Sequence, residues 1–279
     1  MKTIMSLVSI LLVLLVMPVR SQTIPPPAQT GIAEFECGQT FVDTRNNMSY
    51  PTTQIGIQCW FAKNLLIGTK LNNTQMQTNN SVIEYYCPNN DAAKCDVYGG
   101  QYQWGELMNY ATTAGSQGIC PTGWHIPTFE EVYVLINTVG ELQEGRWYGD
   151  STAGAALKEA GYAHWAKEVA YSSRQPTYDY YGGRLSRGEH PTWWKSTNSS
   201  GFTWLPNGYV TSRGTGLTGR VAYLATSSKK PCSVLPGLKH YTDPTPYLVY
   251  FSTMNTQPFV LPGIGYEYRE SMGVRCLKD

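Results

Sequence analysis

The residue types best suited to binding chemistry gather late in the chain, between residues 178 and 194. This stretch is rich in tyrosine, tryptophan and arginine and contains two adjacent glycines. Aromatic rings offer flat apolar faces, arginine donates directional hydrogen bonds, and glycine lets a backbone approach a ligand closely. These properties predict contact with a sugar ring or a protein surface. The candidate ligand-binding residues are Tyr178, Tyr180, Tyr181, Arg184, Trp193, Trp194 and, among glycines farther along, Arg213.

A structural reading of the same stretch carries equal weight. Trp193 and Trp194 could fold back into the core while the tyrosines cover a surface loop. The sequence leaves both readings open.

Residues that could catalyse a reaction do not form a recognisable set. The chain has no Gly-x-Ser-x-Gly elbow, no phosphate-binding loop and no His-Glu-x-x-His pattern. Glu130 and Glu131 are neighbours on one predicted helix and point in different directions, so they make a poor acid–base pair. A hydrogen-bonded structural role is expected for His125, and the other three histidines have no acid or nucleophile at a telling spacing: His164, His190 and His240. We therefore expect no enzymatic activity.

Seven cysteines constrain the compartment and the cofactors. They include no Cys-x-x-Cys pair and no Cys/His cluster, so no zinc site is predicted. Calcium is conceivable, but no cluster of Asp, Glu and Asn resembles a calcium loop, and we expect no cofactor and no metal site. In an exported protein most of these cysteines should be oxidised, and the odd count leaves one thiol over.

The N-terminus predicts export. Lys2 precedes an apolar run over residues 4–16, and small residues lie at the positions that a signal peptidase reads, so residues 1–21 are expected to be a signal peptide. Residues 22–34, with three consecutive prolines, are expected to be an extended leader. Residues 35–279 then form one domain, secreted or held at the cell surface, with no membrane span.

The net charge of the chain limits the classes of partner that it is expected to bind. Removal of residues 1–21 would take away Lys2 and Arg20 and no acid, which lowers the 21 basic side chains to 19 against 20 acidic ones. Near-neutrality argues against nucleic acid or an anionic membrane as partner. A glycan or an extracellular protein remains.

Local patterns predict a mixed α+β fold. Strand-like residues 40–43 and 50–60 flank a turn at residues 45–47 and predict a hairpin. Thr128 and Glu131 have the spacing of a capping box, and the apolar residues up to Val139 follow helical periodicity. A second short helix is predicted over residues 152–160, and the part after Trp165 is predicted to be strands and long loops.

Six motifs, in this order along the chain, resemble the Fibrobacter succinogenes major paralogous domain. They are Gln39–Leu65 (with Ile-Gly-x-Gln-x-Trp), Tyr98–Trp104, Cys120–Pro127, Asn198–Phe202, Leu205–Tyr209 and Gly273–Cys276. The resemblance covers about residues 37 to 279. The chain departs from the family's pattern at residues 223–227, where a Trp-Ser-rich strand is common, and in an insertion-like stretch over residues 170–195.

The resemblance implies a C-type-lectin-like fold with two main helices, a strand-rich and loop-rich C-terminal part, and disulfide bracing. Lectin-like folds return the end of the chain to its middle, which implies a Cys120–Cys276 bridge. Spacing and resemblance together favour Cys87–Cys95, around a local turn, and Cys37–Cys59, on the two limbs of the first hairpin. Cys232 is then left over and available for self-association.

The expected function is a non-catalytic secreted or cell-surface binding or adhesion module, which recognises a glycan or a protein through the aromatic and arginine-rich loop face. One alternative is a structural subunit of an extracellular matrix or filament. Another is an enzyme of the sulfatase-modifying type, which shares the implied fold but uses a redox cysteine pair with no convincing equivalent in this sequence.

Overall fold

The structure of the protein is a computed structural model that describes residues 35–140, 151–166, 196–211, 214–229, 248–254, 261–265 and 270–279. The expected signal peptide and leader, residues 1–34, lie outside these residues. The same holds for Cys232 and for all seven candidate ligand-binding residues, which are Tyr178, Tyr180, Tyr181, Arg184, Trp193, Trp194 and Arg213.

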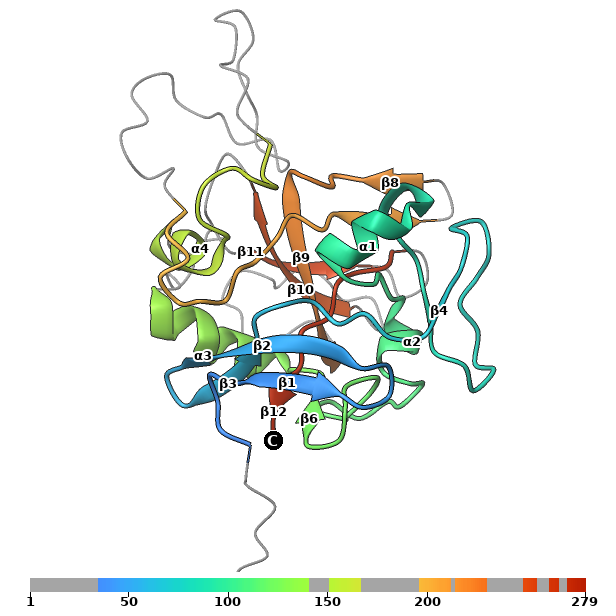
Figure 1. The fold of residues 1–279 in the computed structure, drawn as a ribbon, viewed down its shortest axis with the longest axis horizontal. Coiled ribbons are helices and arrows are strands. Elements are labelled where there is room, and N and C mark those ends of the chain that lie inside the picture. Colours follow the sequence, from blue (N-terminus) through green and yellow to red (C-terminus); the bar gives the residue numbers. More distant parts are fainter. Residues whose placement is uncertain are drawn as a thin grey trace, which may run out of the picture. The chain divides into compact units, whose positions relative to one another are not determined.

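The first sheet begins with the predicted hairpin. Strand β1 (Thr40–Asp43) pairs antiparallel with β2 (Met48–Ile55). The strand expected over residues 50–60 is broken by a turn at Gly56, whose φ of 58° suits glycine, and it resumes as β3 (Gln58–Phe61). The sheet has the order β1-β2-β3-β12-β6 (Figure 1), in which the last two strands are β12 (Leu277–Lys278) and β6 (Trp124–His125).

The two predicted helices are present. Helix α3 (Phe129–Val139) starts at a capping box, in which the Thr128 side chain accepts the Glu131 N–H and the Glu131 carboxylate accepts the Thr128 N–H. Helix α4 (Ser151–Leu157) ends before the expected residue 160, because Lys158 forms a β-bridge with Trp204. None of the helices that the structure describes has the length and apolar composition needed to cross a membrane.

Two short helices were not predicted from the sequence. They are α1 (Ala92–Tyr98) and α2 (Trp104–Leu107), and a 3-10 turn, η1 (Pro88–Asn90), precedes the first of them. Asp91 caps α1 by accepting the N–H of Ala93. A helix of 7 residues is too short to show a clear apolar period, so only a turn was expected here.

The later part of the chain is strand-rich, as predicted. A three-stranded sheet has the order β11-β10-β9, from strands β9 (Val221–Lys229), β10 (Leu248–Met254) and β11 (Leu261–Gly265). Two small two-stranded sheets accompany it: β7 (Tyr209–Thr211) with β8 (Gly214–Gly216), and β4 (Thr69–Lys70) with β5 (Glu84–Tyr85). The fold class is therefore α+β, with few helices and many short strands.

Aromatic side chains fill the core. Trp60, Trp104 and Trp124 lie within the family-like sequence motifs, and all three are buried. The rings of Phe61 and Trp124 lie 4.4 Å apart, and the ring of Tyr50 stacks on Phe61 at 4.8 Å. These contacts pack β2, β3 and β6 of the first sheet against one another.

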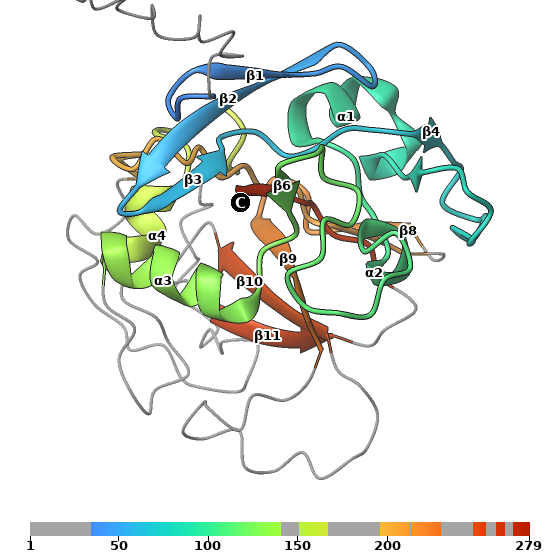
Figure 2. The same ribbon diagram turned by 90° about the horizontal axis from the view of Figure 1, so that it is seen from below.

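The C-terminal residues 271–279, which we call the closing segment, run through this core. Ser271 bridges to Val210, Met272 to Tyr102, and Gly273 to Leu224. Leu277 then pairs with both Trp60 and His125, so that β12 lies between β3 and β6 (Figure 2). Residues 271–277 are all buried. Strands far apart in the sequence are thus held together by the last few residues of the chain.

Candidate functional site

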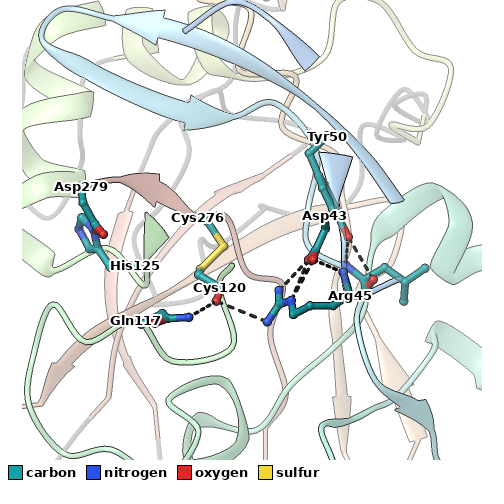
Figure 3. The surroundings of a disulfide bond; sticks show 9 residues. Asp43, Arg45, Tyr50, Gln117, Cys120, His125, Cys276 and Asp279 are labelled. Atoms are coloured by element: carbon teal, nitrogen blue, oxygen red, sulfur yellow. Dashed lines mark hydrogen bonds and ion pairs between the residues drawn. A yellow bond between two sulfur atoms is a disulfide. The ribbon is translucent and has the colours of Figure 1, made fainter. Parts of the chain in front are cut away.

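A disulfide bond anchors the closing segment. Cys120, shortly before β6, is bonded to Cys276, just before β12, and both side chains are fully buried (Figure 3). The bond spans a sequence separation of 156 residues. A crosslink over so long a loop restricts the unfolded chain strongly. The end of the chain is thereby tied to the segment ahead of α3.

The other two disulfides join Cys37 to Cys59 and Cys87 to Cys95, so all three bonds have the pairing expected from the sequence. One detail differs. Cys59 lies in β3 and not in β2, because the turn at Gly56 splits the expected long strand. The Cys37–Cys59 bond therefore reaches past the β1–β2 hairpin to the third strand.

An ion pair between Arg45 and Asp43 lies beside the Cys120 end of the disulfide. Arg45 donates to both carboxylate oxygens of Asp43 and, at 3.4 Å, to the carbonyl oxygen of Cys120, which also accepts from Gln117 (Figure 3). Asp43 is fully buried. Burial alone would raise the pKa of Asp43, but the hydrogen bonds and charge of Arg45 outweigh it and hold the pKa below its usual value. The pair is therefore ionised at neutral pH.

Arg275, beside Cys276, is a buried cation surrounded by carbonyl oxygens. Its guanidinium donates to Asn64 Oδ1 at 2.8 Å and to three backbone carbonyls, those of Phe61, Phe202 and Thr203. It also lies 4.2 Å from the centre of the Phe202 ring. Burial lowers the pKa of Arg275 to about 9, which still leaves the group charged at neutral pH. The closing segment thus carries its own positive charge into a cage of acceptors.

His125 links the closing segment to α3. Its Nδ1 lies 2.7 Å from Asp279 Oδ1, and its Nε2 lies 3.1 Å from both Glu131 oxygens. Only a doubly protonated imidazole can donate to carboxylates at both nitrogens. The hydrogen bond to Glu131 and then that to Asp279 raise the pKa of His125, although burial opposes them. The hydrogen bonding predicted for His125 is confirmed.

A second histidine–carboxylate pair was missed by sequence reasoning. His164 Nδ1 lies 2.7 Å from Glu159 Oε1, so the expectation that His164 has no acid partner was wrong. The side chain of His164 is 33% exposed, whereas that of His125 is 12% exposed. The pair closes an irregular loop, and such a loop offers no period from which the contact could be predicted.

The structure describes the residues that flank the candidate binding stretch. Ala166 precedes residues 167–195, and its N–H donates to the Gly219 carbonyl at 2.7 Å. Thr197, which follows them closely, donates its N–H to Ala155 in α4 at 2.9 Å. Arg213 lies in the sequence between β7 and β8 and is outside the described residues. Both ends of the stretch therefore attach to described parts of the fold.

Within the described part of the chain, no group of three or more His, Cys, Asp or Glu side chains is placed to hold a metal ion.

The fold and its site define a disulfide-braced α+β domain closed by its own C-terminal segment. The model of the Fibrobacter succinogenes major domain matches residues 53–278, so the chain belongs to that family. The match begins somewhat later than the resemblance seen in the sequence, which started near residue 37. Searches of curated proteins and of solved structures found no match.

Proposed function

We propose that this protein is a secreted or cell-surface module without catalytic activity, which recognises a glycan or an extracellular protein through loops carried on a rigid frame. The observation that carries the proposal is the Cys120–Cys276 bond together with the buried closing segment. A fold whose C-terminal end is held by a disulfide can carry long surface loops, because its stability does not come from those loops. The recognition residues that we propose are Tyr178, Tyr180, Tyr181, Arg184, Trp193, Trp194 and Arg213.

Export is part of the proposal. Disulfide bonds form and persist in oxidising compartments, and this chain has three of them. The apolar run over residues 4–16 has the form of a signal peptide. A C-type-lectin-like architecture is also part of it. Its support is the return of the chain end to the segment ahead of α3, which is how lectin-like domains close.

Direct binding measurements test the proposal. Protein lacking residues 1–21 is applied to a glycan array. It is also used to capture proteins from the culture medium of the organism that produces it. We expect a specific ligand, and we expect Tyr180→Ala and Trp194→Ala to weaken its binding. Ile57→Ala removes a side chain that is 92% exposed on the turn between β2 and β3, and it serves as the control. If both aromatic substitutions leave the affinity for the ligand unchanged, the proposal that this loop face binds it is refuted.

One observation favours assembly as a second candidate function. Six of the seven cysteines are bonded to one another, so Cys232 has no cysteine partner left within the chain. A matrix or filament subunit could use it to join neighbouring copies. Non-reducing electrophoresis of secreted protein would then show a covalent dimer that Cys232→Ser abolishes, and a monomer before and after the substitution would reject this function.

A further inference from the structure

The loop of residues 158–166, which we call the His164 corner, combines binding chemistry with a fixed backbone. It begins where the Glu159 N–H donates to the Trp204 carbonyl at 3.2 Å and ends where the Ala166 N–H donates to Gly219. Residues 160–163 between these points are exposed. The corner therefore presents side chains to solvent while its two ends are attached to the frame.

His164 is oriented by Glu159. Because the histidine Nδ1–H donates to Glu159 Oε1, the neutral ring carries its lone pair on Nε2. None of the residues that the structure describes forms a hydrogen bond with Nε2 of His164. An acceptor on a partly exposed ring is thus held in one direction, which is how proteins prepare a histidine for a ligand.

Two tyrosines complete the surroundings. The ring of Tyr98, the last residue of α1, lies edge-on to the His164 ring at 5.9 Å. Burial, and then the negative charge of Glu159, raise the pKa of Tyr98, so that its hydroxyl remains a hydrogen-bond donor. Tyr162 is 50% exposed and offers an aromatic surface two residues before His164. The corner therefore has an acceptor, a donor and a ring face.

Two of the four buried side-chain atoms that lack a hydrogen-bond partner among the described residues belong to this corner; the other two are Gln101 Oε1 and Trp204 Nε1. Glu159 Oε2 and Trp165 Nε1 are buried and have no hydrogen-bond partner among the residues that the structure describes. One is an acceptor and the other is a donor, and both lie beneath the exposed residues of the corner. At His125, by contrast, both carboxylate oxygens of Glu131 and both ring nitrogens are engaged. Unfilled buried groups of this kind are uncommon in native proteins.

We propose that the His164 corner is a subsite for a neutral saccharide, in which Tyr98, Tyr162 and His164 contact the sugar and Glu159 positions His164. Sugar hydroxyls both donate and accept, and the apolar face of a pyranose ring packs on aromatic rings. The carboxylate of Glu159 disfavours an anionic ligand. This inference rests on the proposed binding function and adds to it a ligand class and a site within the described residues.

Affinity measurements on protein lacking residues 1–21 test the subsite. The probes are neutral oligosaccharides of glucose, galactose, mannose and N-acetylglucosamine, measured by titration calorimetry. We expect binding that Tyr162→Ala and His164→Gln each weaken by about tenfold, as expected from the loss of one good contact. Ile57→Ala is the matched control and should leave the affinity unchanged. Unchanged thermal unfolding of each variant shows that the frame is intact.

A positioning role for Glu159 has its own readout. In the nitrogen-15 spectrum of the imidazole, Glu159→Gln should redistribute the neutral His164 ring between its two tautomers, with a loss of affinity for the bound sugar. A mere loop closure would show the spectral change without the loss of affinity.

The outcomes separate this inference from the proposed function. Saccharide binding that is lost in Tyr180→Ala or Trp194→Ala but unaffected in Tyr162→Ala and His164→Gln overturns the subsite and supports the loop face. Binding of a protein and of none of the saccharides overturns the subsite while the proposed function stands. Absence of any saccharide or protein ligand overturns both.

Discussion

The closing segment and the His164 corner use similar side chains in opposite ways. In the closing segment, Arg275 donates to four acceptors, and Asp279 binds one nitrogen of His125, whose other nitrogen is bound by Glu131. In the corner, one histidine nitrogen and one carboxylate oxygen have no hydrogen-bond partner among the described residues. Filled polar groups stabilise a frame, whereas the unbonded nitrogen of a partly exposed histidine keeps capacity for a ligand. Under the proposed function, stability and recognition are therefore located in separate parts of the molecule.

Removal of the terminal disulfide should have the largest effect. Cys120→Ser with Cys276→Ser should lower the free energy of unfolding by roughly 4–5 kcal/mol, because it frees a very long loop in the unfolded chain. Chemical denaturation measures the change. The matched control is Cys87→Ser with Cys95→Ser, whose sequence separation is 8 and whose loss should be smaller, about 2–3 kcal/mol. Equal losses would contradict the special role of the closing segment.

Loss of the buried guanidinium should come next. Arg275→Met leaves buried carbonyls without a donor, and we expect a loss of about 3 kcal/mol. Lys278→Met, three residues farther on and only half-buried, is the control and should change stability by less than about 0.5 kcal/mol. Denaturation of both variants under the same conditions makes the comparison. A small effect at Arg275 would mean that water satisfies its acceptors.

The His125 link should make stability depend on pH. Its pKa is raised above the ordinary value of 6.5 in the folded protein, so the folded state holds the proton more tightly than the unfolded state. The stabilisation is therefore complete below pH 6.5 and is lost as the pH rises through the raised pKa. Denaturation over this range should show the decline, and His125→Gln should remove it. A decline that persists in His125→Gln would assign it to another group.

The smallest effect on stability should come from the His164 corner. The Glu159–His164 pair is partly exposed, so Glu159→Gln should cost less than about 1 kcal/mol. Glu131→Gln is the matching change at the other pair. It weakens both the His125 contact and the capping box, so its loss should be the greater of the two. If denaturation shows the larger loss for Glu159→Gln, the claim that the frame and not the His164 corner provides stability is contradicted.

The sequence predicted the parts of the fold that depend on local patterns. The capping box at Thr128 and the first hairpin, predicted from strand-like residues 40–43 and 50–60, follow from residues close together in the sequence. The split at Gly56 and the 7-residue α1 were missed, because short elements carry little periodicity. The Glu159–His164 contact and the carbonyl cage of Arg275 depend on tertiary placement, which spacing along the chain does not reveal.

The most direct test of the frame is disulfide mapping. Protein collected from outside the cell is alkylated without reduction, digested and analysed by mass spectrometry. We expect one crosslinked species that contains the peptides of Cys120 and Cys276. Recovery of these two cysteines as separate alkylated thiols would contradict the closed frame, and the proposal that it carries recognition loops would lose its support.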